Sequence, residues 1–338
     1  MILCAGLSPA WQQIFVLDAL AVGEVNRARE VHNCASGKVL NVGLAAHCLG
    51  TLSTLVQNEP RKVAQVENCN LRNEKSKPET AVGVSARTLA LVGGLPGAAI
   101  REEFSRLNVS ARWIESQSPT RVCTTILDSA TAMATELVEN AGPISGNEVS
   151  QFEEAYAEEA RHAEVVVLTG SLPAGVPATF YRDLLAQTSG RVVLDAQGAP
   201  LLAALERRPF VVKPNREELG NTLGRQIKTD AELHAAMREL CRRGAMWVVV
   251  TQGKDRVWIG SKDALLSALP PVVEVVNPIG SGDCLAAGIA RALAGGDELP
   301  EAVLLGMAAA ADNVRTLLPA RIDPMQVQAL KETIAGMN

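Results

Sequence analysis

Short runs rich in Val, Leu and Ile alternate with longer segments of helical periodicity along most of this sequence. We expect buried strands at 2–7, 165–169, 191–195, 210–213 and 247–251, most of them ending on glycine or a polar residue. Because strand–helix repetition builds a parallel sheet with helices on both faces, the predicted fold class is α/β. Ligands of such sheets bind at the carboxyl ends of the strands, where these polar residues lie.

Helical segments are expected at 39–49, 98–107, 148–163, 177–187, 201–207 and 230–243, followed by two Ala-rich helices at 282–294 and 300–317. The composition agrees, since 47% of residues are hydrophobic and 3% are aromatic. That balance favours buried strands under Ala- and Leu-rich helices over a β-sandwich. A chain of 338 residues can bury a large core, and we expect one α/β domain over 1–338.

Three stretches interrupt this alternation. Residues 12–33 and 120–140 alternate loosely and predict antiparallel hairpins, which together would form a small β-lid. Residues 57–87 are rich in charge and poor in apolar side chains, so we expect a surface loop or a disordered insertion. The apolar segments 53–56 and 87–92 flank this stretch, and either of them can supply the next strand of the sheet.

Charge, cysteines and missing motifs exclude several classes of protein. The net charge of −5 and the pI near 5.6 argue against nucleic acid or an anionic membrane as partner. No apolar run approaches the ~20 residues that cross a bilayer. The seven cysteines are scattered without a C-x-x-C pair and no export signal is visible, so we expect a cytoplasmic protein. P-loop, G-x-G-x-x-G, H-E-x-x-H and G-x-S-x-G motifs are absent from the sequence.

The segment 277–283, Asn-Pro-Ile-Gly-Ser-Gly-Asp, runs directly into an Ala-rich helix. A Gly-Ser-Gly turn at a helix N-terminus offers backbone amides to a phosphoryl group and lets it approach closely. Asp283 falls in the first turn, where a carboxylate can accept a proton from an attacking hydroxyl. The alternative is a helix cap in which Ser281 or Asp283 merely binds the unpaired amides.

The segment 280–288 resembles the C-terminal signature of the ribokinase/PfkB family of carbohydrate kinases, and 35–42 resembles its N-terminal signature. Further blocks appear in the family's order at 120–122, 135–137, 170–173, 213–218 and 251–254. The likeness covers nearly the whole chain except 57–87 and is greatest to the 1-phosphofructokinase and tagatose-6-phosphate kinase branch. It implies a ribokinase-like, three-layer α/β/α fold and ATP-dependent phosphorylation of a carbohydrate.

The resemblance also implies roles for residues on the nucleotide side. The backbone of Gly280, Ser281 and Gly282 would bind the transferring phosphoryl group, and Asp283 would be the general base. Asn215 and Glu218 match the family's Asn-x-x-Glu motif, which organises Mg²⁺ and its waters, although Asn215 as a helix cap is an alternative. The expected ATP-binding residues are Lys213, Asn215, Thr251, Gly253 and Asn313. ATP and Mg²⁺ are the implied cofactors, and a monovalent cation is compatible with the family.

On the acceptor side, the residues expected to bind the sugar are Gln12, Gly37, Lys38, Asn41 and Arg121. Lys38 and Arg121 are the candidates for binding a phosphate on the substrate. The lysine would act as a point charge, and the arginine would form two parallel hydrogen bonds. Arg27 and Arg29, two apart on an expected lid strand, would add positive charge. The sequence departs from the family at Gln12, where an Asp is usual, and at 35–36, where Ala-Ser replaces a double glycine.

The resulting hypothesis is phosphorylation of a phosphorylated ketohexose, either fructose 1-phosphate or tagatose 6-phosphate. Two alternatives stay open. Gln12 allows a kinase of a free sugar or a nucleoside, and together with the charged insertion it allows a catalytically degenerate regulator that binds sugar phosphates. The expected partner is a small-molecule substrate, and the resemblance is compatible with a homodimer formed through the lids.

Overall fold

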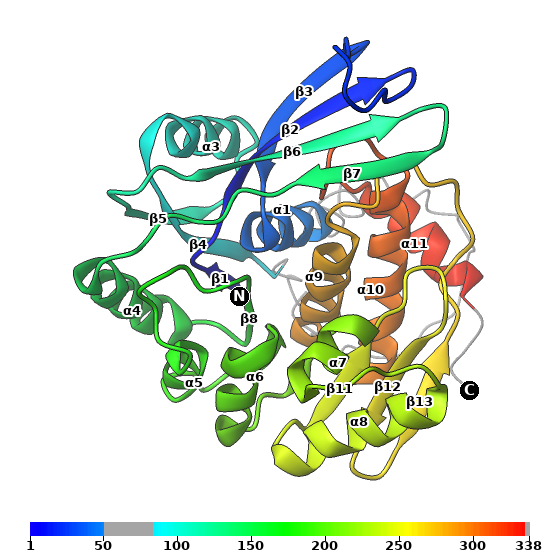
Figure 1. Ribbon diagram of the computed structural model, residues 1–338. Coiled ribbons are helices and arrows are strands. Elements are labelled where there is room, and N and C mark those ends of the chain that lie inside the picture. The colour runs from blue at the N-terminus through cyan, green and yellow to red at the C-terminus, as the bar shows by residue number, and fades with distance from the viewer. Residues whose placement is uncertain (51–83, 335–338) are drawn as a thin grey trace, which may run out of the picture.

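The computed structural model describes residues 1–50 and 84–334. Within them, nine strands form one central sheet (Figure 1). In order across the sheet these are β13 (Leu265–Ala268), β12 (Val257–Ser261), β11 (Trp247–Val250), β10 (Val211–Val212), β9 (Arg191–Asp195), β8 (Val165–Thr169), β1 (Ile2–Gly6), β4 (Ala86–Val92) and β5 (Ala111–Glu115). The strands from β11 to β5 are all parallel to one another. At the other edge, β12 pairs antiparallel with both β11 and β13.

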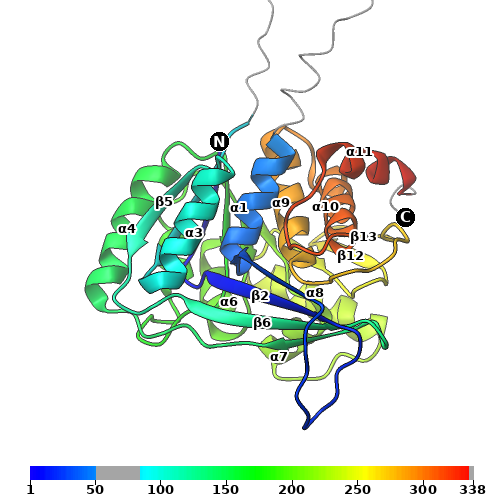
Figure 2. The ribbon, with the colours of Figure 1, turned by 90° about the horizontal axis from the view of Figure 1, so that it is seen from above.

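Helices cover both faces of this sheet. One layer contains α1 (Lys38–Gly50), α3 (Gly94–Arg106), α9 (Ser281–Ala294), α10 (Leu299–Val314) and α11 (Pro324–Thr333). The other contains α4 (Gly146–Ala160), α5 (Phe180–Leu185), α6 (Gly198–Ala204), α7 (Arg216–Leu223) and α8 (Asp230–Arg243). Seen from above, α3, α1, α9 and α10 lie in a row (Figure 2). Along β1, Ile2 and Cys4 pack into the first layer's core, and Leu3 and Ala5 into the second, because successive side chains alternate.

A second, four-stranded sheet lies at the top of Figure 1, in the order β3-β2-β6-β7. It is built from β2 (Ala10–Leu17) and β3 (Glu30–Ser36), which form one hairpin, and from β6 (Arg121–Asp128) and β7 (Met133–Leu137), which form the other. The two hairpins join through parallel pairing of β2 with β6. Ile14 and Cys34 on its inner face pack near Leu317 and Leu318, which follow α10.

The expected α/β/α class and the two expected hairpins are confirmed. Several details differ. Arg27 and Arg29 precede β3 instead of lying on a strand, and Arg29 forms exposed ion pairs with Asp18 and Glu30. The strand beside β1 is β4, so the expected surface loop 57–87 extends too far, because β4 begins at Ala86.

Residues 57–83 of the expected surface loop lie outside the described residues, as does the alternative strand 53–56. The helix expected at 201–207 ends in a 3₁₀ turn, Leu205–Arg207, and the helix expected at 300–317 ends at Val314. None of the helices in the described ranges is both long and apolar enough to span a bilayer.

Candidate active site

A cavity of about 470 Å³ has walls from both sheets and from the N-termini of α1, α7 and α9. All but one of the residues expected at the site line it: Gln12, Gly37, Lys38, Asn41, Arg121, Lys213, Asn215, Glu218, Thr251, Gly253, Gly280, Ser281, Gly282 and Asp283. They come from segments far apart in sequence, which the parallel sheet gathers at the carboxyl ends of its strands.

The turn before α9 depends on glycine. Gly280 is the N-cap of this helix and has a φ of 82°, in the left-handed region that glycine adopts without strain. A Cβ atom at Gly282 would lie 3.5 Å from Nζ of Lys213, so this lysine is close to the first turn of the helix. The amide of Ser281 donates a long hydrogen bond of 3.3 Å to the carbonyl of Pro278. The amides of this turn and the ammonium of Lys213 therefore surround one end of the cavity.

Asp283 lies in the first turn of α9 and lines the cavity although its residue is only 7% exposed. The side-chain amide of Asn41 donates a 2.8 Å hydrogen bond to Oδ2 of Asp283. Burial raises the pKa of Asp283 to about 6, against the attraction of Lys38. Within the described residues no cation lies within ion-pair distance of this carboxylate. It is therefore ionised at neutral pH, yet basic enough to accept a proton.

Asp195, the last residue of β9, binds two lysines that line the cavity. Its Oδ1 atom lies 3.1 Å from Nζ of Lys38, and its Oδ2 atom lies 3.2 Å from Nζ of Lys213. Burial would raise the pKa of Asp195, but Lys213 and Lys38 hold it below its ordinary value. Lys38 also lies 3.5 Å from Oε1 of Glu218, and the charge of Asp195 raises the pKa of Lys38, so Lys38 stays cationic.

Asn215 and Glu218 form a capping box at the start of α7. The amide of Glu218 donates to Oδ1 of Asn215, and the amide of Asn215 donates to Oε2 of Glu218, both at 2.8 Å. The helix cap that was expected from the sequence as the alternative role of Asn215 is thus confirmed. Oε1 of Glu218 is outside the box and lines the cavity beside Lys38.

These oxygens fit Mg²⁺ bound largely through water and nucleotide phosphates, which is how the ion is usually held. Among the described residues, no group of three or more Asp, Glu, His or Cys side chains could hold a metal ion. Mg²⁺ would therefore depend on ligands from the nucleotide and on Oε1 of Glu218, the carboxylate oxygen outside the capping box.

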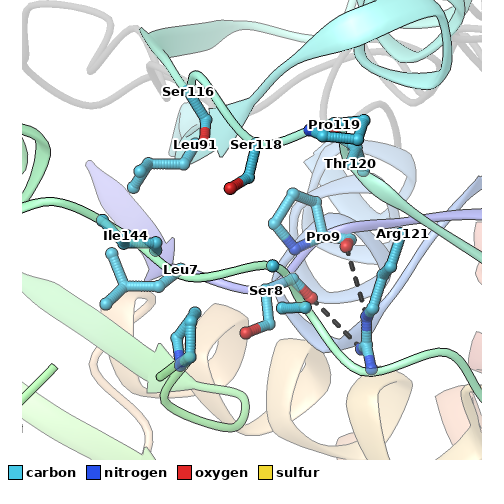
Figure 3. A pocket seen from close by; sticks show the side chains of 13 residues that line it. Leu7, Ser8, Pro9, Leu91, Ser116, Ser118, Pro119, Thr120, Arg121 and Ile144 are labelled. Atoms are coloured by element: carbon cyan, nitrogen blue, oxygen red, sulfur yellow. Dashed lines mark hydrogen bonds between the residues drawn. The ribbon is translucent and has the colours of Figure 1, made fainter. Parts of the chain in front are cut away.

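The opposite wall of the cavity comes from the second sheet. Gln12 is buried, and its side-chain nitrogen donates a 2.7 Å hydrogen bond to the hydroxyl of Thr125. Arg121, at the start of β6, donates to the carbonyls of Ser8, Pro9 and Glu139 at 3.3 to 3.4 Å. Figure 3 shows the first two of these bonds beside a small cavity of about 20 Å³, enough for about one water molecule. The guanidinium is fixed in place with further N–H groups to offer.

Comparison with known proteins decides the family. Residues 80–321 match the model of the pfkB family of carbohydrate kinases. The chain belongs to the pfkB family. It is accordingly a carbohydrate kinase.

Solved structures share the fold of this pfkB kinase. Phosphofructokinase-2 from Escherichia coli, in its tetrameric inhibited form, matches with a TM-score of 0.80 and 22% identity over 98% of each chain. A possible 1-phosphofructokinase from Thermotoga maritima gives 0.82 and 18% over 100% of this chain and 98% of that chain. The ribokinase of Thermotoga maritima gives 0.73 and 18% over 98% and 99%. At these identities the likeness establishes the ribokinase-like fold.

Asn313 is the expected site residue that the structure places elsewhere in this pfkB kinase. Its side chain is fully buried and does not line the cavity. Its amide nitrogen donates to the carbonyl of Ile279 at 2.8 Å, and its Oδ1 accepts from the amide of Ala320 at 2.6 Å. Asn313 thus ties the turn before α9 to the loop after α10 and lies outside the cavity that holds the other expected residues.

Two charged cavity residues were missed from the sequence. Asp195 ends a parallel strand, a position at which an acidic side chain points to the ligand edge of the sheet, and that signal was available. Glu136 on β7 also lines the cavity, and burial raises its pKa, against the attraction of Arg121. Glu136 falls in the block 135–137 that resembles the family, but the resemblance gave this residue no role.

Proposed function

We propose that this kinase transfers the γ-phosphoryl group of ATP to a hydroxyl of a phosphorylated ketohexose, fructose 1-phosphate or tagatose 6-phosphate. The observation that carries the proposal is the convergence of Asp283 and the turn 280–282 with three cationic side chains in one cavity. Those cations are Lys38, Arg121 and Lys213. A carboxylate alone would serve many reactions, but an anion-binding turn lined with cations favours phosphoryl transfer to an anionic acceptor.

In the proposed reaction, Asp283 accepts the proton of the acceptor hydroxyl as its oxygen bonds to the γ-phosphorus. The bond from that phosphorus to the β,γ-bridging oxygen breaks, and ADP leaves. The amides of the 280–282 turn and Lys213 stabilise the charge on the transferring group. Asn215 and Glu218 would hold Mg²⁺ through water, and the ion would neutralise the phosphate oxygens.

On the acceptor side, Lys38 and Arg121 would bind the phosphate already on the sugar. Arg121 is pre-oriented by three carbonyls, so little conformational freedom is lost when its remaining N–H groups bind an anion. An assay of ADP release over a panel of sugars and sugar phosphates tests the proposal. Turnover of ketohexose phosphates supports it, and turnover of unphosphorylated substrates alone contradicts it.

A second candidate, a kinase of a free sugar or nucleoside, is favoured by one observation. The charge of Lys38 is offset by two carboxylates, Asp195 at 3.1 Å and Glu218 at 3.5 Å. The substitutions Lys38→Ala and Arg121→Ala separate the two candidates. A sugar-phosphate kinase should show a KM for the acceptor raised by about tenfold or more, since each charge-assisted contact contributes substantially to affinity. A kinase of an uncharged acceptor should show little change.

We also propose that two copies of the chain associate through the outer face of the four-stranded sheet. Phe15 pairs in register with Val31 and Ile126, and Met133 and Leu137 lie on the same face at 64% and 57% exposure. A symmetric dimer would bury this apolar face of the sheet and remove it from contact with water. Sedimentation of the wild type and of Ile126→Asp tests this: a dimer that becomes a monomer supports the proposal, and a wild-type monomer contradicts it.

A further inference from the structure

A chain of hydrogen bonds runs from Asp283 through two buried residues of the cavity wall, Asn41 and Ser36. Asn41 donates through Nδ2 to Oδ2 of Asp283 at 2.8 Å, and its other end, Oδ1, accepts from the hydroxyl of Ser36 at 3.2 Å. Ser36 and Asn41 are 1% and 2% exposed. The carboxylate of Asp283 only accepts, so it requires the Nδ2 end of the Asn41 amide, and the Ser36 hydroxyl holds the opposite end in place.

The backbone next to Ser36 is held by a buried ion pair. Oε2 of Glu103 accepts from the amide of Ala35 at 2.5 Å, and Nη1 of Arg321 donates to the carbonyl of Ala35 at 3.3 Å. Glu103 on α3 and Arg321 after α10 pair with each other at 2.5 Å, with side chains 8% and 19% exposed. Both backbone groups of Ala35 are thus bound by one pair of charges, which sets the direction in which the chain enters Ser36.

The same guanidinium reaches the other half of the site. Nη1 of Arg321 donates to the carbonyl of Pro319 at 2.7 Å. The ring of Pro319 packs against Gly280, since a Cβ atom at Gly280 would lie 3.1 Å from Cβ of Pro319. Neither Glu103 nor Arg321 lines the cavity. This ion pair lies outside the cavity and binds the backbone of Ala35, next to Ser36. Through Pro319 it also supports Gly280 in the turn before α9.

We propose that Ser36, Glu103 and Arg321 are positioning residues for phosphoryl transfer. The ion pair fixes the backbone at Ala35, the Ser36 hydroxyl holds the outer end of the Asn41 amide, and Asn41 holds one oxygen of Asp283 so that the other faces the attacking hydroxyl. This inference rests on the proposed role of Asp283 as the base. It gives Asn41 a role in addition to the sugar contact expected from the sequence, since its amide binds Ser36 and Asp283 and also lines the cavity.

Other charges also act on Asp283, and the test must leave them unchanged. Lys38 from α1 and Lys213 after β10 favour its ionised form, whereas Asp195 from β9 opposes it. Ser36→Ala removes one uncharged hydroxyl and alters none of these charges. The matched control is Ser267→Ala, because Ser267 is also buried and accepts a side-chain hydrogen bond, from Arg256, on β13 outside the cavity.

Ser36→Ala should lower kcat by about 3- to 10-fold, the effect of one buried hydrogen bond, and leave the KM for ATP unchanged. It should also move the acid limb of the kcat profile to higher pH, because a carboxylate that loses a donor becomes more basic. Ser36→Thr, which keeps a hydroxyl, should restore both. An unchanged kcat and acid limb, or equal effects in the Ser267→Ala control, would overturn the proposal.

The ion pair is tested by replacing both partners together, since a single substitution would leave a buried charge unpaired. Glu103→Gln with Arg321→Met should lower kcat as Ser36→Ala does, and adding Ser36→Ala to this background should lower it little further. Effects that multiply instead would show that the pair does not act through Ser36, and would overturn that step.

A readout without turnover separates this inference from the proposed function. The titration of the Asp283 carboxyl is followed by carbon NMR of aspartate-labelled enzyme without substrates, and Asp283→Asn assigns the signal. If Ser36→Ala raises the pKa of Asp283, the positioning network exists even where Asp283→Asn retains turnover and the role as base fails. If the pKa is unchanged while Asp283→Asn abolishes turnover, the proposed function survives and the positioning network is overturned.

Discussion

Asp195 binds Lys38 and Lys213 at the same time, one with each carboxylate oxygen, at 3.1 and 3.2 Å. Both lysines line the cavity, one at the start of α1 and the other after β10. A single buried anion therefore sets the distance between two cations of the site. The lysines are thus held in place without a ligand, which would reduce the reorganisation that binding of an anion requires.

Replacing Asp195 with Asn should keep the shape of this contact and remove its charge. We expect kcat/KM for ATP to fall by about tenfold or more, because both lysines lose a charge-assisted partner and are no longer held in position. Steady-state kinetics with ATP varied at saturating sugar measures the effect. A change of less than about twofold in kcat/KM, with intact folding by circular dichroism, would be inconsistent with this role for Asp195.

Asp283→Asn should lower kcat by about 100-fold or more, since general base catalysis contributes on that scale. The affinity for ATP should change little, because the carboxylate acts on the acceptor hydroxyl and not on the nucleotide. ADP release gives kcat, and calorimetric titration with a non-hydrolysable ATP analogue gives the dissociation constant. Retained turnover would remove Asp283 from the role of base.

The activity should fall as the pH drops through about 6, the value to which burial raises the pKa of Asp283. A general base works only when deprotonated, so the acid limb of the kcat/KM profile reports its protonation in the free enzyme. The profile of kcat/KM for the acceptor from about pH 3.5 to 8 provides the measurement. An acid limb near pH 4, the ordinary range of an aspartate, would show that the carboxyl is not perturbed as described.

The same carboxyl should make the fold less stable as pH rises. The pKa of Asp283 is about 6 in the folded chain against an ordinary value of 3.8, so the folded state binds more protons between these values. The free energy of unfolding therefore falls as pH rises through this window, and the loss is complete above about pH 6. Asp283→Asn should recover up to about 3 kcal/mol at pH 8 and much less at pH 4, measured by urea denaturation.

Gly280→Ala should cost about 1–3 kcal/mol of stability, because its φ of 82° disfavours a side chain and the new Cβ would crowd Pro319. The matched control is Gly146→Ala at the start of α4, where a Cβ atom meets nothing within 4 Å. Thermal denaturation and kcat are measured for both variants. Equal effects of the two substitutions would contradict the special geometry of the turn before α9.

The fold and most of the cavity could be predicted because both depend on local patterns. Buried parallel strands such as β8 are continuous apolar runs, and the Gly-Ser-Gly turn is visible in the sequence. The antiparallel β12 and β13 were not foreseen, since they are short and lie at the edge of the sheet, where the apolar pattern is weaker. The local pattern of residues also does not show which buried polar side chains form hydrogen bonds with one another.

Contacts between distant segments explain what the sequence did not show. Asn313 was assigned to the nucleotide from its position in the sequence, and its amide binds the backbone of Ile279 and Ala320. Asn41 lines the cavity as expected, but its bonds to Ser36 and Asp283, which join residues up to 242 positions apart, were not foreseen. Such pairings follow from tertiary packing and leave no signature in the spacing of either partner.

The packing of the second sheet on Leu317 and Leu318 has a mechanical consequence. These leucines continue directly into Pro319, which packs against Gly280, so the sheet and the turn before α9 share one support. An outward movement of the sheet would therefore also loosen that turn, so the position of the sheet and the shape of the turn depend on each other.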